Sequence, residues 1–316
     1  MNIVAALYKF SLIESPHILQ SKIRRKLKSL SILGTILVGK EGLNGTISGK
    51  KENIDKAIKY IKNIDGFCDV DVKFSKSLVN PFIRLKIKLK DEIVTIGDKS
   101  INPNKEVGKY VNPEEWNDLI SNKNTILIDT RNNYEHSIGT FKNSLNPNTI
   151  KFREFPEWVR KQKFSDHEKQ NRKFAMFCTG GIRCEKSTSY LVSQGFEQVW
   201  HLQGGILKYL EEVPVSESRW QGECFVFDAR VAVNHDLEQG SFDQCYACRH
   251  PITEAAKESS KYEKGISCPR CYDQRSDRQR ARFQERQKQV ELAASRGERH
   301  IGGEPPIRQA KDASSQ

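Results

Sequence analysis

The sequence contains no apolar run long enough to cross a membrane. Its 316 residues are 37% hydrophobic and 29% charged, and no stretch approaches the roughly 18 consecutive apolar residues of a membrane-spanning helix. The first residues, MNIVAALYKFSLIES, also lack the basic start and the small-residue cleavage site of a secretory signal peptide. We therefore expect a globular protein of the cytoplasm that has no membrane partner.

Motifs for common redox cofactors are absent as well. The sequence has no flavin or nicotinamide motif and no obvious redox iron site. Disulfides are rare in a reducing cytosol, so the 8 cysteines are expected to be catalytic or metal-binding. A chain of this length can form two or three domains, each with its own core.

What the sequence does contain is the pattern of a reactive cysteine within residues 173–195. An apolar strand at 174–177 runs into Cys178, two glycines permit positive φ in the following loop, and a helix comes next. Amide groups at a helix N-terminus point into such a loop and stabilise an anion, including a thiolate. Arg183 adds a positive charge. We expect the pKa of Cys178 to lie below the reference of about 8.5, which makes the thiol nucleophilic near neutral pH.

The distance in sequence between Cys178 and Arg183 distinguishes this loop from that of a cysteine phosphatase. Phosphatases of the dual-specificity type require Cys-x5-Arg, in which the arginine binds the phosphate through two hydrogen bonds. Here the spacing is Cys-x4-Arg, and Cys184 occupies the phosphatase arginine position. The shorter loop favours a smaller group such as a sulfane sulfur. Cys184 is either a resolving thiol for an oxidised Cys178 or a small residue packed at the helix start.

Residues 1–92 are predicted to form a ferredoxin-like domain. The expected order of elements is that of a split βαβ fold, in which two helices cover one face of a four-stranded sheet and the other face is open. The glycine-rich segment 39–45 is either a loop that approaches a phosphate or a hairpin turn. The expected strands lie at 3–10, 34–38, 46–48, 70–74 and 82–89, and the expected helices at about 15–30 and 51–64.

Positive charge is concentrated in this first domain. Residues 1–100 hold 19 Lys and Arg against 10 Asp and Glu, so +9 of the net charge of +12 lies there. In the segment PFIRLKIKLK apolar and basic residues alternate, which places the charge on one face of a strand. Either this face is an ordinary solvated surface, or it contacts the phosphates of a nucleic acid through Arg84, Lys86, Lys88 and Lys90.

After a linker at 93–110, residues 111–215 show the alternation of strands and helices that is typical of a parallel α/β domain. A helix is expected to begin at Pro113 behind an asparagine cap. Buried strands end at Asp129 and at Cys178. Active sites of parallel sheets lie at the carboxyl ends of the strands, so both residues are predicted to lie at that edge.

Three motifs in this region carry a resemblance to a known family. They are IDTRNNYE (128–135), CTGGIR (178–183) and VWHLQGGI (199–206), and together they resemble a rhodanese domain. The segment HSIGTFKNSL departs from the Gly-His-Ile-x-Gly-Ala element that is usual in that family. The resemblance implies that Cys178 carries a persulfide held by the amides of the active-site loop Thr179, Gly180, Gly181 and Ile182, with Asp129, Arg131 and Glu135 as supporting residues.

Four cysteines form two C-x-x-C pairs within residues 216–275. The pairs are separated by 19 residues, a spacing typical of a tetrahedral zinc site, and four thiolates leave no coordination position open for catalysis. We therefore predict a structural zinc ion bound by Cys245, Cys248, Cys268 and Cys271. Residues 276–316 are rich in arginine, and we expect a partly disordered tail. Its arginine-rich run either forms a helix on RNA and is accessory to RNA binding, or is merely solvated.

The whole arrangement resembles the rhodanese-type tRNA uridine hydroxylases over nearly the full chain, and the motif CTGGIRCEKS, with both cysteines, is distinctive. The resemblance implies oxygen-dependent formation of 5-hydroxyuridine at the wobble uridine, with molecular oxygen as co-substrate, the anticodon arm of tRNA as partner and Cys178 as the essential cysteine. The residues themselves leave two alternatives open, a sulfurtransferase and a non-enzymatic RNA-binding protein. No protein partner can be inferred.

The charged strand gives the first testable prediction. Replacing Lys86, Lys88 and Lys90 together with Ala is expected to weaken tRNA binding and to flatten its dependence on salt, because fewer counterions are released from the phosphates. Titration of labelled tRNA at several salt concentrations measures both effects. Unchanged binding would remove this strand from the RNA surface.

Overall fold

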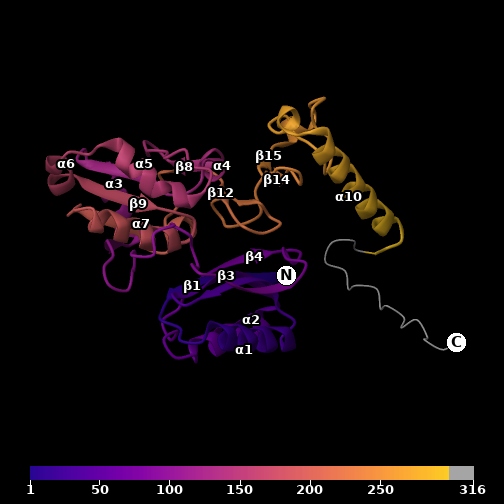
Figure 1. Ribbon diagram of the computed structural model, residues 1–316, viewed down its shortest axis with the longest axis horizontal. Coiled ribbons are helices and arrows are strands. Elements are labelled where there is room, and N and C mark those ends of the chain that lie inside the picture. The colour runs from indigo at the N-terminus through magenta and orange to yellow at the C-terminus, as the bar shows by residue number, and fades with distance from the viewer. Residues whose placement is uncertain (299–316) are drawn as a thin grey trace, which may run out of the picture. The chain divides into compact units, whose positions relative to one another are not determined.

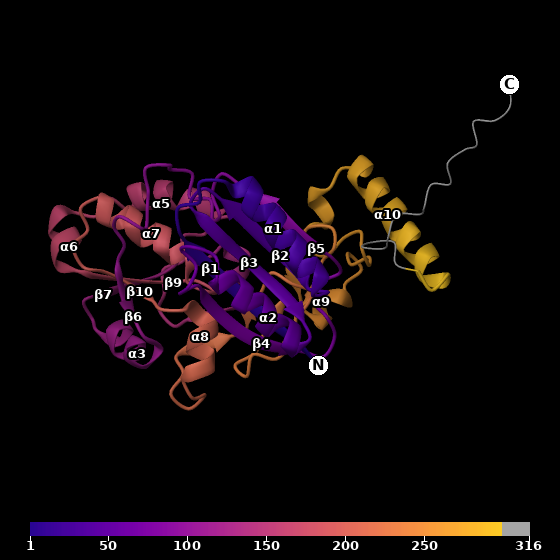
Figure 2. The ribbon, with the colours of Figure 1, turned by 90° about the horizontal axis from the view of Figure 1, so that it is seen from below.

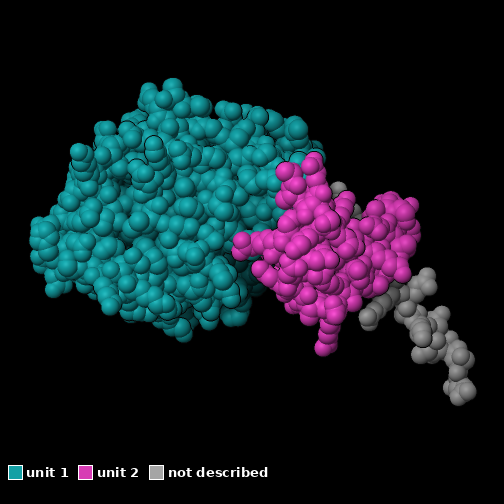
Figure 3. Space-filling view, turned by 90° about the horizontal axis from the view of Figure 1, so that it is seen from above, with its two compact units in different colours: residues 1–244, 250–254 teal, residues 245–249, 255–316 magenta. Residues whose placement is uncertain are grey.

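The computed structural model describes residues 1–298, which divide into two compact units (Figure 3). Unit 1 comprises residues 1–244 and 250–254, and unit 2 comprises 245–249 together with the residues from 255 onward. The last part of the predicted tail, 299–316, lies outside the described residues. Within 1–298, no helix combines the length and the apolar character needed to span a bilayer.

The N-terminal part of unit 1 is a five-stranded sheet with two helices on one face (Figures 1 and 2). The strand order is β4-β1-β3-β2-β5, in which β5 runs parallel to β2 and the other neighbours are antiparallel. The ferredoxin-like prediction is confirmed, with five strands in the sheet instead of four. The elements are β1 (Asn2–Phe10), α1 (Pro16–Ser29), β2 (Leu33–Gly39), β3 (Gly42–Gly49), α2 (Lys51–Lys62), β4 (Asp71–Ser77) and β5 (Leu85–Leu89).

Both helices are fixed by apolar residues at helical spacing. In α1, Ile23 and Leu27 are fully buried, and in α2, Ile54 and Ile61 are fully buried against the same face of the sheet. Burying one such side chain contributes about 1.5–3 kcal/mol relative to leaving it in water. The helices therefore occupy one face of the sheet and leave the other for a different partner.

The glycine-rich segment 39–45 forms a hairpin. Of the two interpretations left open by the sequence, a loop that approaches a phosphate or a hairpin turn, the second describes its structure. Gly39 pairs with Gly42, so the turn lies at residues 40–41. Gly42 has φ +145, and a Cβ there would lie 2.0 Å from the Lys9 carbonyl oxygen of β1. The glycine is needed because two strands approach closely, and no phosphate is required to explain it.

The central part of unit 1 contains the predicted parallel sheet, whose four strands have the order β6-β10-β9-β7. Asn112 caps its first helix, since the Asn112 side chain accepts a hydrogen bond from the Glu115 amide at 2.8 Å. The strands and main helices are β6 (Lys109–Val111), α3 (Pro113–Ser121), β7 (Thr125–Asp129), α5 (Phe155–Gln162), β9 (Lys173–Phe177), α7 (Ile182–Ser193), β10 (Val199–Leu202) and α8 (Gly205–Glu212). Shorter elements are α4 (Asn133–His136), β8 (Gly139–Phe141) and α6 (Asp166–Asn171).

Two segments that the sequence placed outside these domains are packed into unit 1. In the expected linker 93–110, Ile93 and Ile96 are each 1% exposed. In the expected zinc module, residues 216–244 belong to unit 1, because Trp220 and Cys224 join the apolar core of the parallel sheet. Here β11 (Trp220–Gly222) pairs with β8, β12 (Cys224–Phe225) pairs with β13 (Ala232–Val233), and β14 (Asp243–Gln244) pairs with β15 (Pro251–Ile252).

Buried polar contacts join the five-stranded sheet to α7. Lys186 is 1% exposed, and its Nζ pairs with Glu92 at 2.6 Å and with Glu41 at 2.9 Å. The Tyr8 hydroxyl of β1 donates to Glu185 of α7 at 3.0 Å. The sheet face that was expected to be open is therefore turned toward the chain around Cys178, and its polar residues need not be solvent-facing.

The main described element of unit 2 is α10 (Asp277–Ser295), a helix of 19 residues. Ser276 begins it with a capping box, in which its side chain accepts from the Gln279 amide and Gln279 accepts from the Ser276 amide. The first half of the predicted tail is thus helical. A short helix, α9 (Glu254–Lys257), lies where the chain passes between the units.

Candidate active site

Cys178 follows the last residue of β9 and lies at the start of the loop that leads into α7. Gly181 is the N-terminal cap of α7 with φ +99, and its amide donates to the Cys178 sulfur at 3.1 Å. A Cβ at Gly181 would also lie 2.9 Å from the Tyr8 hydroxyl oxygen. Glycine is therefore required here both by the backbone conformation and by the close approach of β1.

Several groups make Cys178 a thiolate. Burial by itself would raise the pKa of this thiol, since its sulfur lies out of solvent. A hydrogen bond from the Cys184 thiol, the charge of Arg183 and the amides of Arg183 and Cys184 act in the opposite direction and lower the pKa of Cys178 to about 5. The direction is the one that the loop sequence predicted, and the Cys184 contribution was not anticipated.

Cys184 lies behind Cys178 in the first turn of α7. It is fully buried, does not line the cavity described below, and its sulfur is 3.7 Å from the Thr130 hydroxyl. Burial, the hydrogen bond to Cys178 and the Cys178 charge raise the pKa of Cys184, so it stays protonated and can donate. This position agrees with the packed-residue interpretation and adds a donor role.

Arg183 is held by Glu135 through two hydrogen bonds. Arg183 Nη1 donates to Glu135 Oε2 and Nη2 donates to Oε1, each at 2.7 Å, and the Glu135 side chain is fully buried. Such a two-point contact compensates both charges for the loss of water. Glu135 thus fixes the guanidinium whose charge acts on Cys178.

Asp129 and Arg131 form a second buried pair away from the cavity. Arg131 donates to Asp129 through Nε at 2.9 Å and through Nη2 at 2.6 Å, and Nη2 also donates to the Gly139 carbonyl at 2.6 Å. Both side chains have no exposed surface, and neither lines the cavity. Their location at the end of β7 fits the predicted supporting role, through the fold of the segment from β7 to β8.

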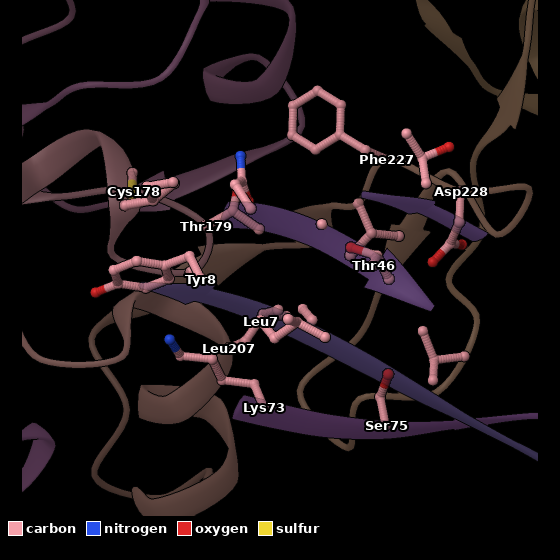
Figure 4. Close-up of a pocket in the computed structure, with 18 of the residues that line it drawn as sticks. Leu7, Tyr8, Thr46, Lys73, Ser75, Cys178, Thr179, Leu207, Phe227 and Asp228 are labelled. Atoms are coloured by element: carbon pink, nitrogen blue, oxygen red, sulfur yellow. The ribbon is translucent and has the colours of Figure 1, made fainter. Parts of the chain in front are cut away.

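A cavity of about 430 Å³ opens beside Cys178 (Figure 4). One side is formed by Cys178, Thr179, Gly180, Ile182 and Arg183, and further lining comes from Leu207, Val226, Phe227, Asp228 and Arg230. The other side is the face of the N-terminal sheet opposite α1 and α2, including Tyr8, Thr46, Lys73 and Ser75.

The sequence analysis did not find the residues that the N-terminal sheet contributes. Their signal was present in β3, where Asn44, Thr46 and Ser48 alternate with buried or small residues. This face of the sheet was expected to be open, and a single strand pattern does not tell whether water or another domain covers its polar side.

The predicted RNA-binding residues Arg84, Lys86, Lys88 and Lys90 lie in and beside β5, the edge strand of the N-terminal sheet. None of the four lines the cavity. Ile87 between them is 3% exposed and packs against the helices, whereas Ile83, expected on the same apolar face, precedes the strand and is 45% exposed.

In unit 2 the four cysteines Cys245, Cys248, Cys268 and Cys271 come together. Their sulfur atoms all lie within 4.8 Å of one another, close enough to hold a metal ion. Cys68, by contrast, is an isolated exposed cysteine of the N-terminal domain.

Two family models match the chain. Residues 2–93 match the UPF0176 acylphosphatase like domain, and residues 112–212 match the rhodanese-like domain. The chain thus combines an acylphosphatase-like domain of ferredoxin topology with a rhodanese-like domain, and Cys178 belongs to the second.

Solved structures resemble parts of the chain. A rhodanese-related protein from Thermoplasma volcanium is 24% identical, with 33% of this chain and 93% of that chain covered, at a TM-score of 0.27. A protein of unknown function from Rhodopseudomonas palustris, described as a possible tyrosine phosphatase, is 16% identical (34% and 83% covered, TM-score 0.29). An acylphosphatase from Coxiella burnetii is 10% identical (28% and 92% covered, TM-score 0.22).

The lowered pKa of Cys178 leads to a test by alkylation. The rate of iodoacetamide modification at Cys178, followed by peptide mass spectrometry, is expected to be half-maximal near pH 5 and flat around neutrality, because only the thiolate reacts. Cys184→Ala removes a donor and is expected to shift the midpoint upward, whereas Cys184→Ser keeps a donor and shifts it less. A wild-type midpoint at or above the ordinary value of about 8.5 would show that burial cancels or outweighs the donors.

Proposed function

We propose that this protein hydroxylates the wobble uridine of tRNA to 5-hydroxyuridine, with Cys178 as the nucleophile and molecular oxygen as co-substrate. The observation that carries the proposal is a stabilised thiolate in the wall of a cavity whose opposite side belongs to a positively charged domain. Resemblance to the rhodanese-type tRNA uridine hydroxylases supplies the reaction. The rhodanese-like domain supplies the reactive loop.

The loop residues perform three tasks in this scheme. The amide of Gly181 and the Cys184 thiol hold Cys178 as a thiolate, and Arg183, fixed by Glu135, keeps positive charge beside it. The thiolate adds to C6 of the uracil ring, which spreads negative charge over C5 and the C4 carbonyl and makes C5 the atom that receives oxygen. One atom of molecular oxygen is placed on C5, and the other leaves as water after reduction by two electrons from an external reductant. Release of the thiolate from C6 with loss of a ring proton restores the double bond.

Access of the base requires that it leave its stack, which an anticodon loop permits at low cost. Phosphates of the anticodon arm would be contacted by the basic residues at β5 and by the arginines of α10. These contacts position the RNA, whereas the cavity selects the base. The reaction would take place in the cytoplasm, together with the tRNA.

A sulfurtransferase activity is the second candidate, because the same thiolate can accept a sulfane sulfur and the same amides can hold the resulting persulfide. The rhodanese-like domain favours this candidate independently of any RNA. The two activities leave different products in tRNA, an added oxygen atom in one case and sulfur in place of oxygen in the other.

Nucleoside mass spectrometry of total tRNA tests the proposal. Cells that lack the protein are expected to lose 5-hydroxyuridine and its derivatives, wild-type protein restores them, and Cys178→Ser does not, because the hydroxyl is a far weaker nucleophile. Cys68→Ser is the matched control, since Cys68 is exposed and away from the cavity, and it should restore the nucleoside fully. Full restoration by Cys178→Ser would refute the mechanism, and a sulfur-for-oxygen exchange would select the second candidate.

For the four-cysteine cluster we propose a zinc ion with a structural role. A tetrahedral ion with Zn–S bonds of about 2.3 Å separates its sulfurs by about 3.8 Å. The sulfur–sulfur distances are 4.0 Å for Cys245 and Cys271, 3.8 Å for Cys248 and Cys268, and 3.8 Å for Cys268 and Cys271. The donor set and spacing therefore fit zinc, which would cross-link the two C-x-x-C turns.

Removal of the metal is expected to unfold unit 2. Purified protein should contain about one zinc ion per chain, and a strong chelator should make residues 245–298 sensitive to protease, because the binding free energy of such an ion is folding free energy. Cys268→Ser should have the same effect, and Cys68→Ser should not. Unchanged protease resistance of the metal-free chain would overturn the structural role.

A further inference from the structure

The cavity side formed by the N-terminal sheet is one continuous row of side chains across four strands. Thr35 of β2 is paired with Thr46 of β3, Thr46 with Ala6 of β1, and Ala6 with Lys73 of β4. Directly paired residues of antiparallel strands point to the same face. All four line the cavity.

Lys73 is the cation of this row, and it is almost entirely buried. Its exposure is 5%, its Nζ lies 4.5 Å from the centre of the Tyr8 ring, and it forms an ion pair with Asp71. Figure 4 shows the amino group pointing along the sheet toward Tyr8, at the Cys178 end of the cavity. Burial lowers the pKa of Lys73 and Asp71 opposes this shift.

An ammonium group has three N–H donors and no acceptor. One N–H of Lys73 is donated to the carboxylate of Asp71, and the ammonium also faces the Tyr8 ring, so among these contacts at least one donor remains for a ligand. A donor left over in a buried position is costly, so a ligand oxygen at this point would be bound strongly. Thr46 differs, because a hydroxyl rotates and can donate or accept.

The rest of the lining is largely apolar, including Ile182, Leu207, Val226 and Phe227. Such walls accept the faces of a flat ring and exclude water, which strengthens each hydrogen bond made at the sheet. The cavity thus fits a planar heterocycle with a polar edge turned to the row of Thr46 and Lys73.

We propose that Lys73 recognises a ring carbonyl and thereby makes the cavity select uracil over cytosine, so that specificity resides in the N-terminal sheet while the reactive thiol resides in the rhodanese-like domain. The inference rests on the proposed function for the identity of the substrate as a pyrimidine of tRNA. Uracil presents an oxygen where cytosine presents an amino group. The Lys73 ammonium can donate a hydrogen bond to this oxygen of uracil, but it offers no acceptor to the amino group of cytosine. The Thr46 hydroxyl can bond to either base, because it can donate or accept.

Binding measurements separate these roles without requiring turnover. Fluorescence anisotropy with full-length protein would use two labelled anticodon stem-loop RNAs that differ only in uridine or cytidine at the wobble position. Wild-type protein is expected to prefer the uridine RNA by about tenfold or more, the value of one hydrogen bond to a charged group. Lys73→Met is expected to abolish the preference for the uridine RNA. Thr46→Val is expected to lower the affinity for both RNAs by the same factor.

Lys76→Met is the matched control, because Lys76 lies on the same strand, is exposed and does not line the cavity. It should leave the preference intact. If Lys73→Met does not fold, as shown by thermal unfolding, Lys73→Gln replaces it and should narrow the preference, since an amide both donates and accepts.

The inference is overturned if wild-type protein shows no preference, or if the preference survives in folded Lys73→Met or Lys73→Gln. Failure of the wild-type protein to restore 5-hydroxyuridine in cells that lack it would refute the proposed reaction alone. A preference that still depends on Lys73 would then identify a site that binds uracil for another chemistry.

Discussion

The hydrogen bond from the Gly181 amide to the Cys178 sulfur, 3.1 Å long, is one of the donor contacts that a buried thiolate at this position needs, and the surrounding residues supply the others. A negative charge in a buried position has lost most of its water, and the protein has to supply donors in its place. The helix start supplies amides, Cys184 supplies a thiol and Arg183 supplies a charge. The charge of Arg183 is itself buried and needs a partner, and Glu135 provides one by forming a buried ion pair with it.

The candidate site belongs to more than one domain. The first family model matches the chain up to residue 93 and the second matches residues 112–212. The cavity is lined by side chains from both regions and by Val226, Phe227, Asp228 and Arg230 beyond them. Arg230 shows how the last segment is held, because it pairs with Asp228 and donates to Ser75 of β4 at 2.8 Å. The N-terminal domain is therefore a wall of the site as well as a charged surface.

Local patterns in the sequence were sufficient for the fold class and for the reactive loop. The strand before Cys178, the glycines after it and the capping residue Asn112 each act through neighbours a few positions away, and the structure has them as expected. Contacts between distant segments were not predictable in this way. Tyr8 and Glu185 are 177 positions apart, and nothing local to Tyr8 shows that it touches α7. The same limit explains why 93–110 and 216–244 were assigned to a linker and a zinc module.

The contact between Tyr8 and Gly181 also bears on how this protein can change over evolutionary time. A side chain at position 181 would collide with the Tyr8 hydroxyl, and Lys186 of α7 is enclosed by Glu41 and Glu92 from the N-terminal side. A foreign rhodanese-like domain fused behind residues 1–92 would arrive without these matched partners. Substitutions on one side of this contact therefore constrain the residues that are tolerated on the other.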